Sequence, residues 1–184
     1  MIEKEEIKKE ETKKQENKSK SKKHSAAYYA ITFFVKLGVT AAVVMILLVF
    51  VVGIYVNHTN LSYPMIKDGD LCLTYKMAKL SEGDEIVYMD GDKVRFGRIV
   101  AMPGDTVDIN DEAVLVNGYG VYEDTVYPTT KEGSSIDYPY TVPTDTVFVL
   151  NDYRADPSDS RKLGGIPLSE TKGKVIMLLR RRGI

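Results

Sequence analysis

The sequence predicts a mostly β protein: an antiparallel β-domain carried on a single N-terminal transmembrane helix. One observation is an uncharged run of 20 residues, 37–56, which is long enough to cross a bilayer core as a helix. The other is that residues 57–184 alternate short Val-, Ile- and Tyr-rich runs with Gly, Asp and Pro, the pattern of strands and turns. The expected parts are therefore a tail at 1–36, a helix at 37–56 and a β-domain at 57–184.

The tail sets the expected orientation of the helix. Residues 1–36 hold ten Lys and six Glu, and no acidic residue lies between Asn17 and Lys36. A lysine excess beside one end of a transmembrane helix keeps that end in the cytoplasm. We expect a single-pass protein of the cell membrane, with a cytoplasmic N-terminus and an extracytoplasmic C-terminal domain. A cleaved signal peptide fits less well, because 36 residues precede an apolar run that is longer than the usual signal-peptide core.

The charge of the C-terminal part excludes one class of partner. Residues 57–184 hold 15 Lys and Arg against 20 Asp and Glu, a net charge of −5. Nucleic-acid binding needs a basic face, so we expect no nucleic acid as partner. The single cysteine, Cys72, lies between Leu71 and Leu73 and is interpreted as a buried apolar side chain.

The strands of the β-domain are predicted from short β-branched and aromatic runs. These runs are residues 70–75, 85–89, 94–101, 106–109, 113–116 and 146–150. Asn117-Gly118, between 113–116 and 121–126, predicts a two-residue hairpin turn. The Tyr-rich segment 119–140 fits either local packing or a partner-binding loop, and we favour packing.

Three motifs follow the apolar run in order. They are Tyr63-Pro64-Met65-Ile66-Lys67-Asp68-Gly69-Asp70, then Gly97-Arg98-Ile99-Val100-Ala101-Met102-Pro103-Gly104-Asp105, then Asn151-Asp152-Tyr153-Arg154-Ala155-Asp156-Pro157-Ser158-Asp159-Ser160-Arg161 with Gly165-Ile166-Pro167 and Gly173-Lys174 after it. In this order, just after a membrane anchor, they resemble the bacterial type I signal peptidases (peptidase S26). The resemblance covers essentially all of residues 37–184, and Asp159-Ser160-Arg161 with its Gly-Ile-Pro sequel is the specific part.

The resemblance implies a serine endopeptidase chemistry without metal or cofactor. In the family, a serine hydroxyl attacks the scissile carbonyl of an exported preprotein, and a buried, neutral lysine takes its proton. Burial lowers a lysine pKa, which makes it a base near neutrality. A further serine holds the lysine in place, and the substrate binds as an added strand at a sheet edge.

Carried over residue by residue, the three chemical positions fall on residues that cannot perform these roles. The nucleophile position is Leu61, the general-base position is Gly97, and the lysine-orienting position is Pro157. By contrast, Arg98, Asp159 and Arg161 match positions that form an ion-pair cluster beside the family's active site. The resemblance thus implies a preserved fold with no catalytic residue expected, and the chain leans toward not being an enzyme.

Three functions are compatible with this alignment, and all three keep the family fold. The first is a catalytically inactive member that holds an exported protein such as a pilin for assembly by a sortase, similar to the non-catalytic signal-peptidase-like proteins of Gram-positive pilus clusters. The second is an active signal peptidase with Ser62 as displaced nucleophile. Ser62 would still need a base: Lys93 lies four residues before Gly97, the expected base position, which is about 13 Å along a strand and beyond hydrogen-bond reach. The third is a membrane-tethered interaction domain that keeps no peptide groove.

Overall fold

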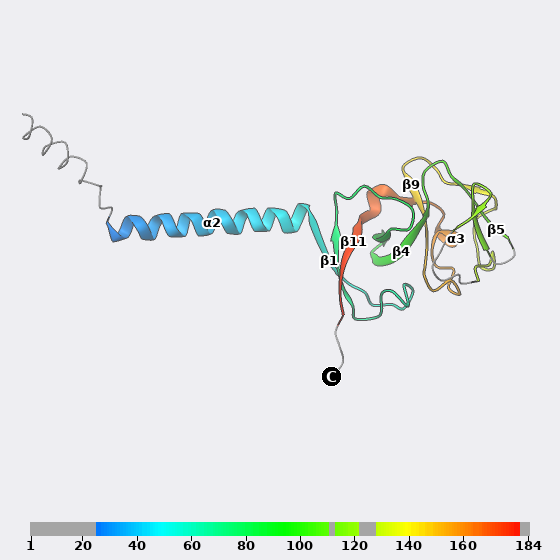
Figure 1. Cartoon of the computed structure of the whole chain (residues 1–184), viewed down its shortest axis with the longest axis horizontal. Coiled ribbons are helices and arrows are strands. Elements are labelled where there is room, and N and C mark those ends of the chain that lie inside the picture. Colours follow the sequence, from blue (N-terminus) through cyan, green and yellow to red (C-terminus); the bar gives the residue numbers. More distant parts are fainter. Residues whose placement is uncertain (1–24, 111–112, 122–127, 181–184) are drawn as a thin grey trace, which may run out of the picture. The chain divides into compact units, whose positions relative to one another are not determined.

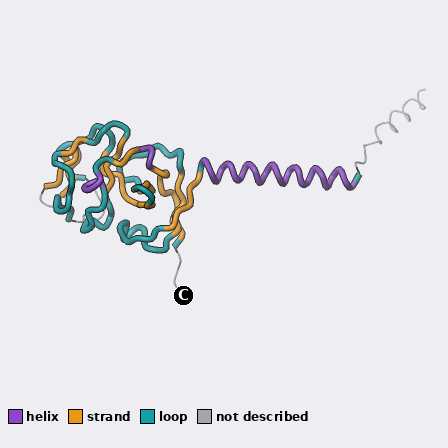
Figure 2. Tube along the Cα trace, turned by 180° about the vertical axis from the view of Figure 1, so that it is seen from behind, coloured by secondary structure: helices purple, strands orange, loops and turns teal. Residues whose placement is uncertain are grey.

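The computed structural model describes residues 25–110, 113–121 and 128–180. This part of the chain contains one long helix, α2 (Ala26–Phe50), and a β-domain with eleven strands, β1 to β11 (Figures 1 and 2). Residues 1–24 of the tail and most of the predicted strand 121–126 lie outside the described residues. The mostly antiparallel β architecture with an N-terminal apolar helix is confirmed.

Helix α2 is long and apolar enough to cross a membrane, although its bounds differ from the expected 37–56. Its 25 residues give a length of about 38 Å, and none of its side chains is buried. It begins after Ser25, whose hydroxyl and carbonyl both accept from the Tyr28 N–H. The predicted start at residue 37 is too late, because the prediction rested on a run free of charge, whereas the helix includes Lys36.

The end of the predicted helix is a strand. Residues Val52–Val56 form β1, which pairs antiparallel with β2 (Leu71–Tyr75). The sequence Val-Gly-Ile-Tyr-Val suits a strand because β-branched and aromatic side chains pack well on a pleated sheet. Tyr55 packs beside Cys72 in the core, whereas Ile54 and Val56 are exposed. An apolar composition alone did not distinguish these residues from the end of the helix.

Seven strands form the larger sheet, in the order β1-β2-β11-β3-β4-β9-β10, with antiparallel pairing throughout. The members not yet given are β3 (Glu85–Asp90), β4 (Lys93–Ala101), β9 (Thr146–Leu150), β10 (Ile166–Pro167) and β11 (Thr171–Leu179). Helix α3 (Ser160–Leu163) and the 3₁₀ helix η1 (Leu168–Glu170) lie between β9 and β11 in the chain. Strand β11 was not predicted, because two register shifts and Gly173 interrupt its alternation.

A smaller sheet has the order β7-β6-β5-β8. Its strands are β5 (Thr106–Asn110), β6 (Ala113–Val116), β7 (Tyr119–Gly120) and β8 (Tyr140–Thr141). The predicted hairpin turn is confirmed: Asn117 and Gly118 have φ of 54° and 84°, the left-handed values that a tight two-residue turn needs. Figure 1 shows β5 at one end of the β-domain and β1 with β11 at the other.

The apolar core joins the two sheets. Val107 and Val114 of the smaller sheet pack with Val100, Phe148 and Leu150 of the larger one. Two further clusters lie within the larger sheet, one around Ile86, Tyr88, Ile99 and Val149, the other around Ile66, Cys72, Val87 and Phe96.

The core also tests the predictions for Cys72 and for the Tyr-rich segment. The Cys72 side chain is fully buried, as predicted, and burial raises the pKa of its thiol to about 11, so the thiol stays protonated. Tyr138 and Tyr140 pack against the core, in line with the packing interpretation of the Tyr-rich segment, whereas Tyr119 is 78% exposed. Tyr122 and Tyr127 lie outside the described residues.

Candidate functional site

The segment between β1 and β2 carries the expected nucleophile position, and backbone hydrogen bonds hold it in place. The buried Asn57 donates from Nδ2 to the carbonyls of Thr59 (2.7 Å) and Lys67 (3.2 Å). The Asn57 N–H donates to the Asp70 carbonyl at 2.9 Å, which closes the segment at its base. The Tyr153 N–H donates to the Leu61 carbonyl at 2.8 Å and joins the segment to the third motif. The position of Leu61 is therefore fixed from both sides.

The two candidate nucleophile positions differ in exposure. Leu61 is half-buried, and Ser62 is fully buried. Among the described residues, the Ser62 hydroxyl makes no hydrogen bond, neither to a lysine nor to any other group. It lies close enough to the Glu85 carboxyl to lower its pKa. Ser62 thus faces a carboxyl inside the domain, and the carboxyl oxygens also have no hydrogen-bond partner there.

Neighbouring strands pack closely against Gly97, which is the expected general-base position. Gly97 lies in β4 and is buried. A Cβ built on Gly97 would lie 2.6 Å from Val149 Cγ1, 3.2 Å from the Leu150 carbonyl oxygen and 3.6 Å from Tyr88 Cε1. Real Cβ atoms essentially never approach another heavy atom as closely as 2.6 Å. The space that a side chain at position 97 would need is therefore filled by β9 and β3.

Position 97 and Ser62 also lie on different faces of the β3–β4 pair. Successive side chains of a strand point to opposite faces, so Gly97 and Arg98 face opposite ways. Glu85 pairs with Arg98 in the register and shares its face, and Ser62 lies beside Glu85. A side chain at position 97 would instead enter the Ile86–Tyr88–Val149 cluster. The geometry separates Ser62 from the family's base position.

The third expected chemical position, Pro157, has a packing role. Its ring contacts Gly133, where an added Cβ would lie 2.8 Å from Pro157 Cγ. The next residue, Ser158, donates from its backbone N–H to Asp156 Oδ1 at 2.8 Å. Pro157 has no hydrogen-bonding side chain with which to orient a base.

Arg98, Asp159 and Arg161, which the resemblance placed in one ion-pair cluster, belong to two separate sets of contacts. Arg98 donates to both carboxylate oxygens of Asp152, from Nε and Nη2, each at 2.8 Å. It also donates from Nη1 to the Gly83 carbonyl at 2.8 Å, and its Nη2 lies 3.4 Å from Met65 Sδ. This corrects the expected cluster of Arg98, Asp159 and Arg161 by adding Asp152 as the bidentate partner. Asp152 could have been singled out from the sequence, because it belongs to Asn151-Asp152 at the start of the third motif.

Glu85 was not singled out from the sequence, yet it is the most perturbed acid of this region. It is 7% exposed, and Arg98 Nη2 lies 3.5 Å from its Oε2. Burial raises the pKa of Glu85 to about 8, with a further increase from the Asp152 charge and partial relief from Arg98. Because Arg98 already pairs with Asp152, the Glu85 carboxyl is favoured in its protonated form. A buried acid beside a serine leaves no signal in a strand pattern, which explains why it was missed.

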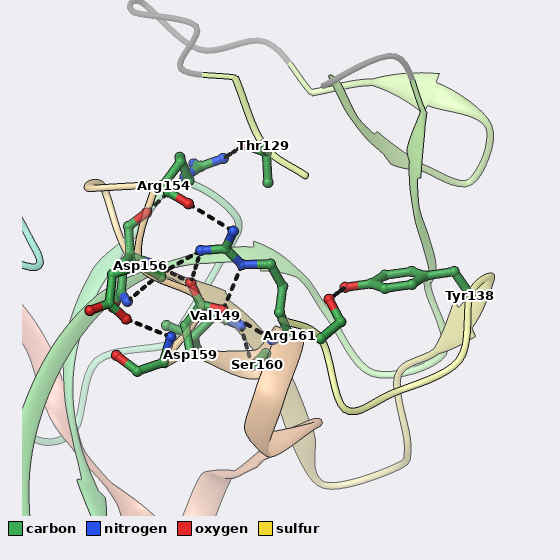
Figure 3. Close-up of polar contacts among 11 residues, drawn as sticks. Thr129, Tyr138, Val149, Arg154, Asp156, Asp159, Ser160 and Arg161 are labelled. Carbon is green, nitrogen blue, oxygen red and sulfur yellow. Dashed lines mark hydrogen bonds and ion pairs between the residues drawn. The ribbon is translucent and has the colours of Figure 1, made fainter. Parts of the chain in front are cut away.

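The second ion pair is the centre of a buried hydrogen-bond network (Figure 3). Arg161 is 1% exposed and donates to Asp159 from Nε (3.0 Å) and Nη2 (2.8 Å). Its remaining donors reach the carbonyls of Arg154 (2.8 Å) and Asp156 (2.7 Å). Asp159 also caps α3 through the Arg161 N–H and accepts from the Asn151 N–H at 3.0 Å. Four of the five guanidinium N–H donors are thus engaged within the domain, so the buried Arg161 fixes this loop.

The serine of the Asp159-Ser160-Arg161 motif belongs to the same structure. Ser160 is buried, and its Oγ accepts from the Val149 N–H at 2.9 Å. The Arg161 carbonyl in turn accepts from the Ser135 N–H at 2.9 Å, which ties the third motif to the Tyr-rich segment. The motif therefore positions β9 behind Gly97. Among the described residues, no group of three His, Cys, Asp or Glu side chains could hold a metal ion.

Comparisons with known proteins agree with the motifs. The family model "Signal peptidase, peptidase S26" matches residues 30–179. A signal peptidase I of Bacillus licheniformis is 31% identical over 147 residues, covering 71% of this chain and 77% of that protein. Signal peptidase I S of Bacillus subtilis (strain 168) is 29% identical over 137 residues, covering 67% of this chain and 74% of its own. The crystal structure of a signal peptidase I from Enterococcus faecalis V583 matches with a TM-score of 0.47 and 25% identity, covering 54% of this chain and 98% of that one.

A β-domain that follows an N-terminal apolar helix in the chain, with the three motifs in order, defines the class of signal-peptidase-like proteins. Since the family model matches most of its length, the chain belongs to the signal peptidase I family, peptidase S26.

Proposed function

We propose that this protein is a membrane-anchored member of the signal peptidase I family that holds an exported protein without cutting it. The domain lies on the extracytoplasmic side of a single-pass anchor, and the held client is an exported protein such as a pilin, which a sortase then assembles. The pilin and sortase parts rest on the family resemblance.

The observation that carries the proposal is the packing at Gly97. Loss of a catalytic lysine by one substitution would leave an empty space, whereas here Val149 Cγ1 comes within 2.6 Å of where a Cβ would start. The nucleophile position holds Leu61, which has no nucleophilic atom. A side chain at position 97 thus finds no free space in the folded domain, which supports a family member that holds a peptide without hydrolysing it.

The peptide-holding part is supported by the sheet topology. Strand β1 is an edge of the larger sheet, and among the described residues it is paired with β2 alone. It continues directly into the segment that carries Leu61, so a peptide added along the open side of β1 would lead toward that position. Strand addition of this kind takes its affinity from main-chain hydrogen bonds and needs no catalytic side chain.

The first experiment uses the full chain in lipid nanodiscs with a signal-peptide-bearing preprotein. Binding is followed by fluorescence anisotropy of the labelled peptide, and cleavage by mass spectrometry. We expect saturable binding and intact peptide, both unchanged in Ser62→Ala. Cleavage that disappears in Ser62→Ala would overturn the proposal, and absence of any binding would leave only a tethered interaction domain.

The pilus part has its own experiment. A strain without this protein is complemented with the wild-type chain or with Ser62→Ala, and the length of the surface polymers is compared by immunoblot. We expect the deletion to shorten or abolish the polymers and both forms to restore them equally. Normal polymers in the deletion strain would remove the pilin and sortase assignment.

One observation favours the alternative of an active peptidase. Ser62 lies beside the Glu85 carboxyl, which is a chemically competent general base once it ionises above its raised pKa of about 8. Against it, Ser62 has no exposed surface, so the segment between β1 and β2 would have to open before a peptide could reach the hydroxyl. The cleavage assay with Ser62→Ala separates this alternative from the first proposal.

A further inference from the structure

The turn after β2 is joined to the last turn of the apolar helix. The Lys76 Nζ donates to the Val49 carbonyl at 2.6 Å, and the Lys76 backbone N–H donates to the Val51 carbonyl at 2.9 Å. The last carbonyls of a helix lack an intrahelical donor, and a lysine there also suits the negative end of the helix dipole. Lys76 therefore caps the end of α2 from the β-domain side.

Two more lysines lie close to this cap. Lys79 is exposed at the end of the same turn. Lys172, the second residue of β11, lies beside β2, because its carbonyl accepts from Thr74 Oγ1 at 3.0 Å and a Cβ on the neighbouring Gly173 would lie 2.9 Å from Lys76 Cα. Among the described residues, none of these three lysines has an acidic partner within ion-pair distance. Other lysines of the domain, such as Lys131 and Lys174, do.

An apolar side chain stands between the lysines. Met77 is 68% exposed at the tip of the turn, and the Ala78 N–H closes the turn on the Tyr75 carbonyl. An exposed apolar side chain flanked by lysines, whose long stems keep the charge at the headgroups, is typical of a chain at a membrane surface. The domain as a whole is net −5, so three lysines beside one turn, without an acidic partner among the described residues, run against its overall charge.

We propose that Lys76, Met77, Lys79 and Lys172 form a lipid-binding surface for the outer leaflet. The lysines bind the phosphates of anionic phospholipids, while Met77 enters the interface between headgroups and acyl chains. The surface lies where the helix ends, which places it at headgroup level when α2 spans the bilayer. This inference rests on the anchor and orientation in the proposed function, and not on client binding.

The test measures the depth of Met77 in the full chain. Met77→Cys is labelled with an environment-sensitive fluorophore, and Tyr119→Cys is the matched control, since Tyr119 is also exposed but belongs to the smaller sheet. The native Cys72 is fully buried and is not expected to react. Both proteins are reconstituted in nanodiscs of phosphatidylcholine alone or mixed with phosphatidylglycerol, with a nitroxide-labelled lipid as quencher.

We expect the label at position 77 to be quenched, more strongly when phosphatidylglycerol is present, and the label at 119 to be unquenched in both lipids. Lys79→Gln with Lys172→Gln leaves the helix cap intact and should remove the phosphatidylglycerol dependence, at about fivefold in local lipid affinity per lysine. Equal quenching at 77 and 119, or no response to phosphatidylglycerol, would overturn the proposal.

Two further measurements keep this test separate from the proposed function. Protease protection in sealed vesicles reports whether the β-domain lies outside the membrane, and the preprotein-binding assay reports client holding. Quenching at position 77 with no preprotein binding would refute the holding function alone. A correctly oriented domain that binds preprotein but shows no quenching would refute the lipid surface alone.

Discussion

Placing serine at position 61 and lysine at position 97 would return both chemical groups of the family to their aligned positions. The structure indicates that the second change is not accommodated. The Cβ of any residue at 97 would lie 2.6 Å from Val149 Cγ1 and 3.2 Å from the Leu150 carbonyl oxygen. Inserting even one carbon into a packed core costs about 1–3 kcal/mol, and a lysine ammonium directed into this apolar cluster adds several more. We expect Leu61→Ser with Gly97→Lys to be severely destabilised and to cleave nothing.

The smaller variant Gly97→Ala measures the packing term alone. For a domain of this size, a loss of about 1–3 kcal/mol lowers the melting temperature by roughly 3–15 °C, which thermal unfolding by circular dichroism resolves. Val149→Ala removes the methyl group in closest approach and is the matched second site. Because the two positions are in contact, we expect the double variant to be less destabilised than the sum of the single variants, by about 0.5–3 kcal/mol.

One outcome would refute this reasoning directly. If Leu61→Ser with Gly97→Lys melts at the wild-type temperature and cleaves a preprotein, then position 97 has room for a base, and only the missing side chains prevent hydrolysis. A Gly97→Ala variant as stable as the wild type would argue against the packing interpretation in the same way.

Three further variants test the buried polar groups. Glu85→Gln should raise the melting temperature at neutral and alkaline pH. Because the pKa of Glu85 is raised to about 8 in the folded state, its contribution to the free energy of unfolding is fully present below pH 4.5 and is lost as the pH rises through 8. The melting temperature of the variant should therefore depend less on pH than that of the wild type, which a pH series of melting curves measures. Ser62→Ala should be neutral or stabilising by up to about 1 kcal/mol, because it removes a buried hydroxyl without a hydrogen bond; a clear loss in denaturant titration would show that the hydroxyl is bonded. Arg161→Lys keeps the charge but loses the hydrogen bonds to the Arg154 and Asp156 carbonyls. We expect the free energy of unfolding, measured by denaturant titration, to fall by about 3–5 kcal/mol. The same change at the exposed Arg180 is the control and should cost under about 1 kcal/mol.

Local patterns predicted most of the sheet. Glu85–Asp90, Ala113–Val116 and Thr146–Leu150 are short apolar runs between turn residues, and each forms a strand within one residue of the prediction. Residues 52–56 were assigned to the helix, because nothing in an apolar run marks where a helix becomes a strand. Residues 52–56 form a strand because they pair with β2, and that pairing is a property of the folded chain.

The candidate site was predictable only as far as the motifs reach. Alignment located Leu61 and Gly97, but it described Gly97 as a missing side chain and not as a filled position. The filling depends on Val149 and Tyr88, which come from two other strands. The pairing of Arg98 with Asp152 and the burial of Ser62 beside Glu85 likewise depend on contacts between distant segments. Such contacts leave no trace in composition or spacing.

A single residue, Val51, separates the end of α2 from the start of β1. If α2 spans the bilayer as proposed, so short a connection leaves the domain little room to move away from the membrane surface. Under the proposed function, a client would then have to reach the domain while still attached to the same membrane, and the two anchored proteins would meet by lateral diffusion in the plane of the bilayer.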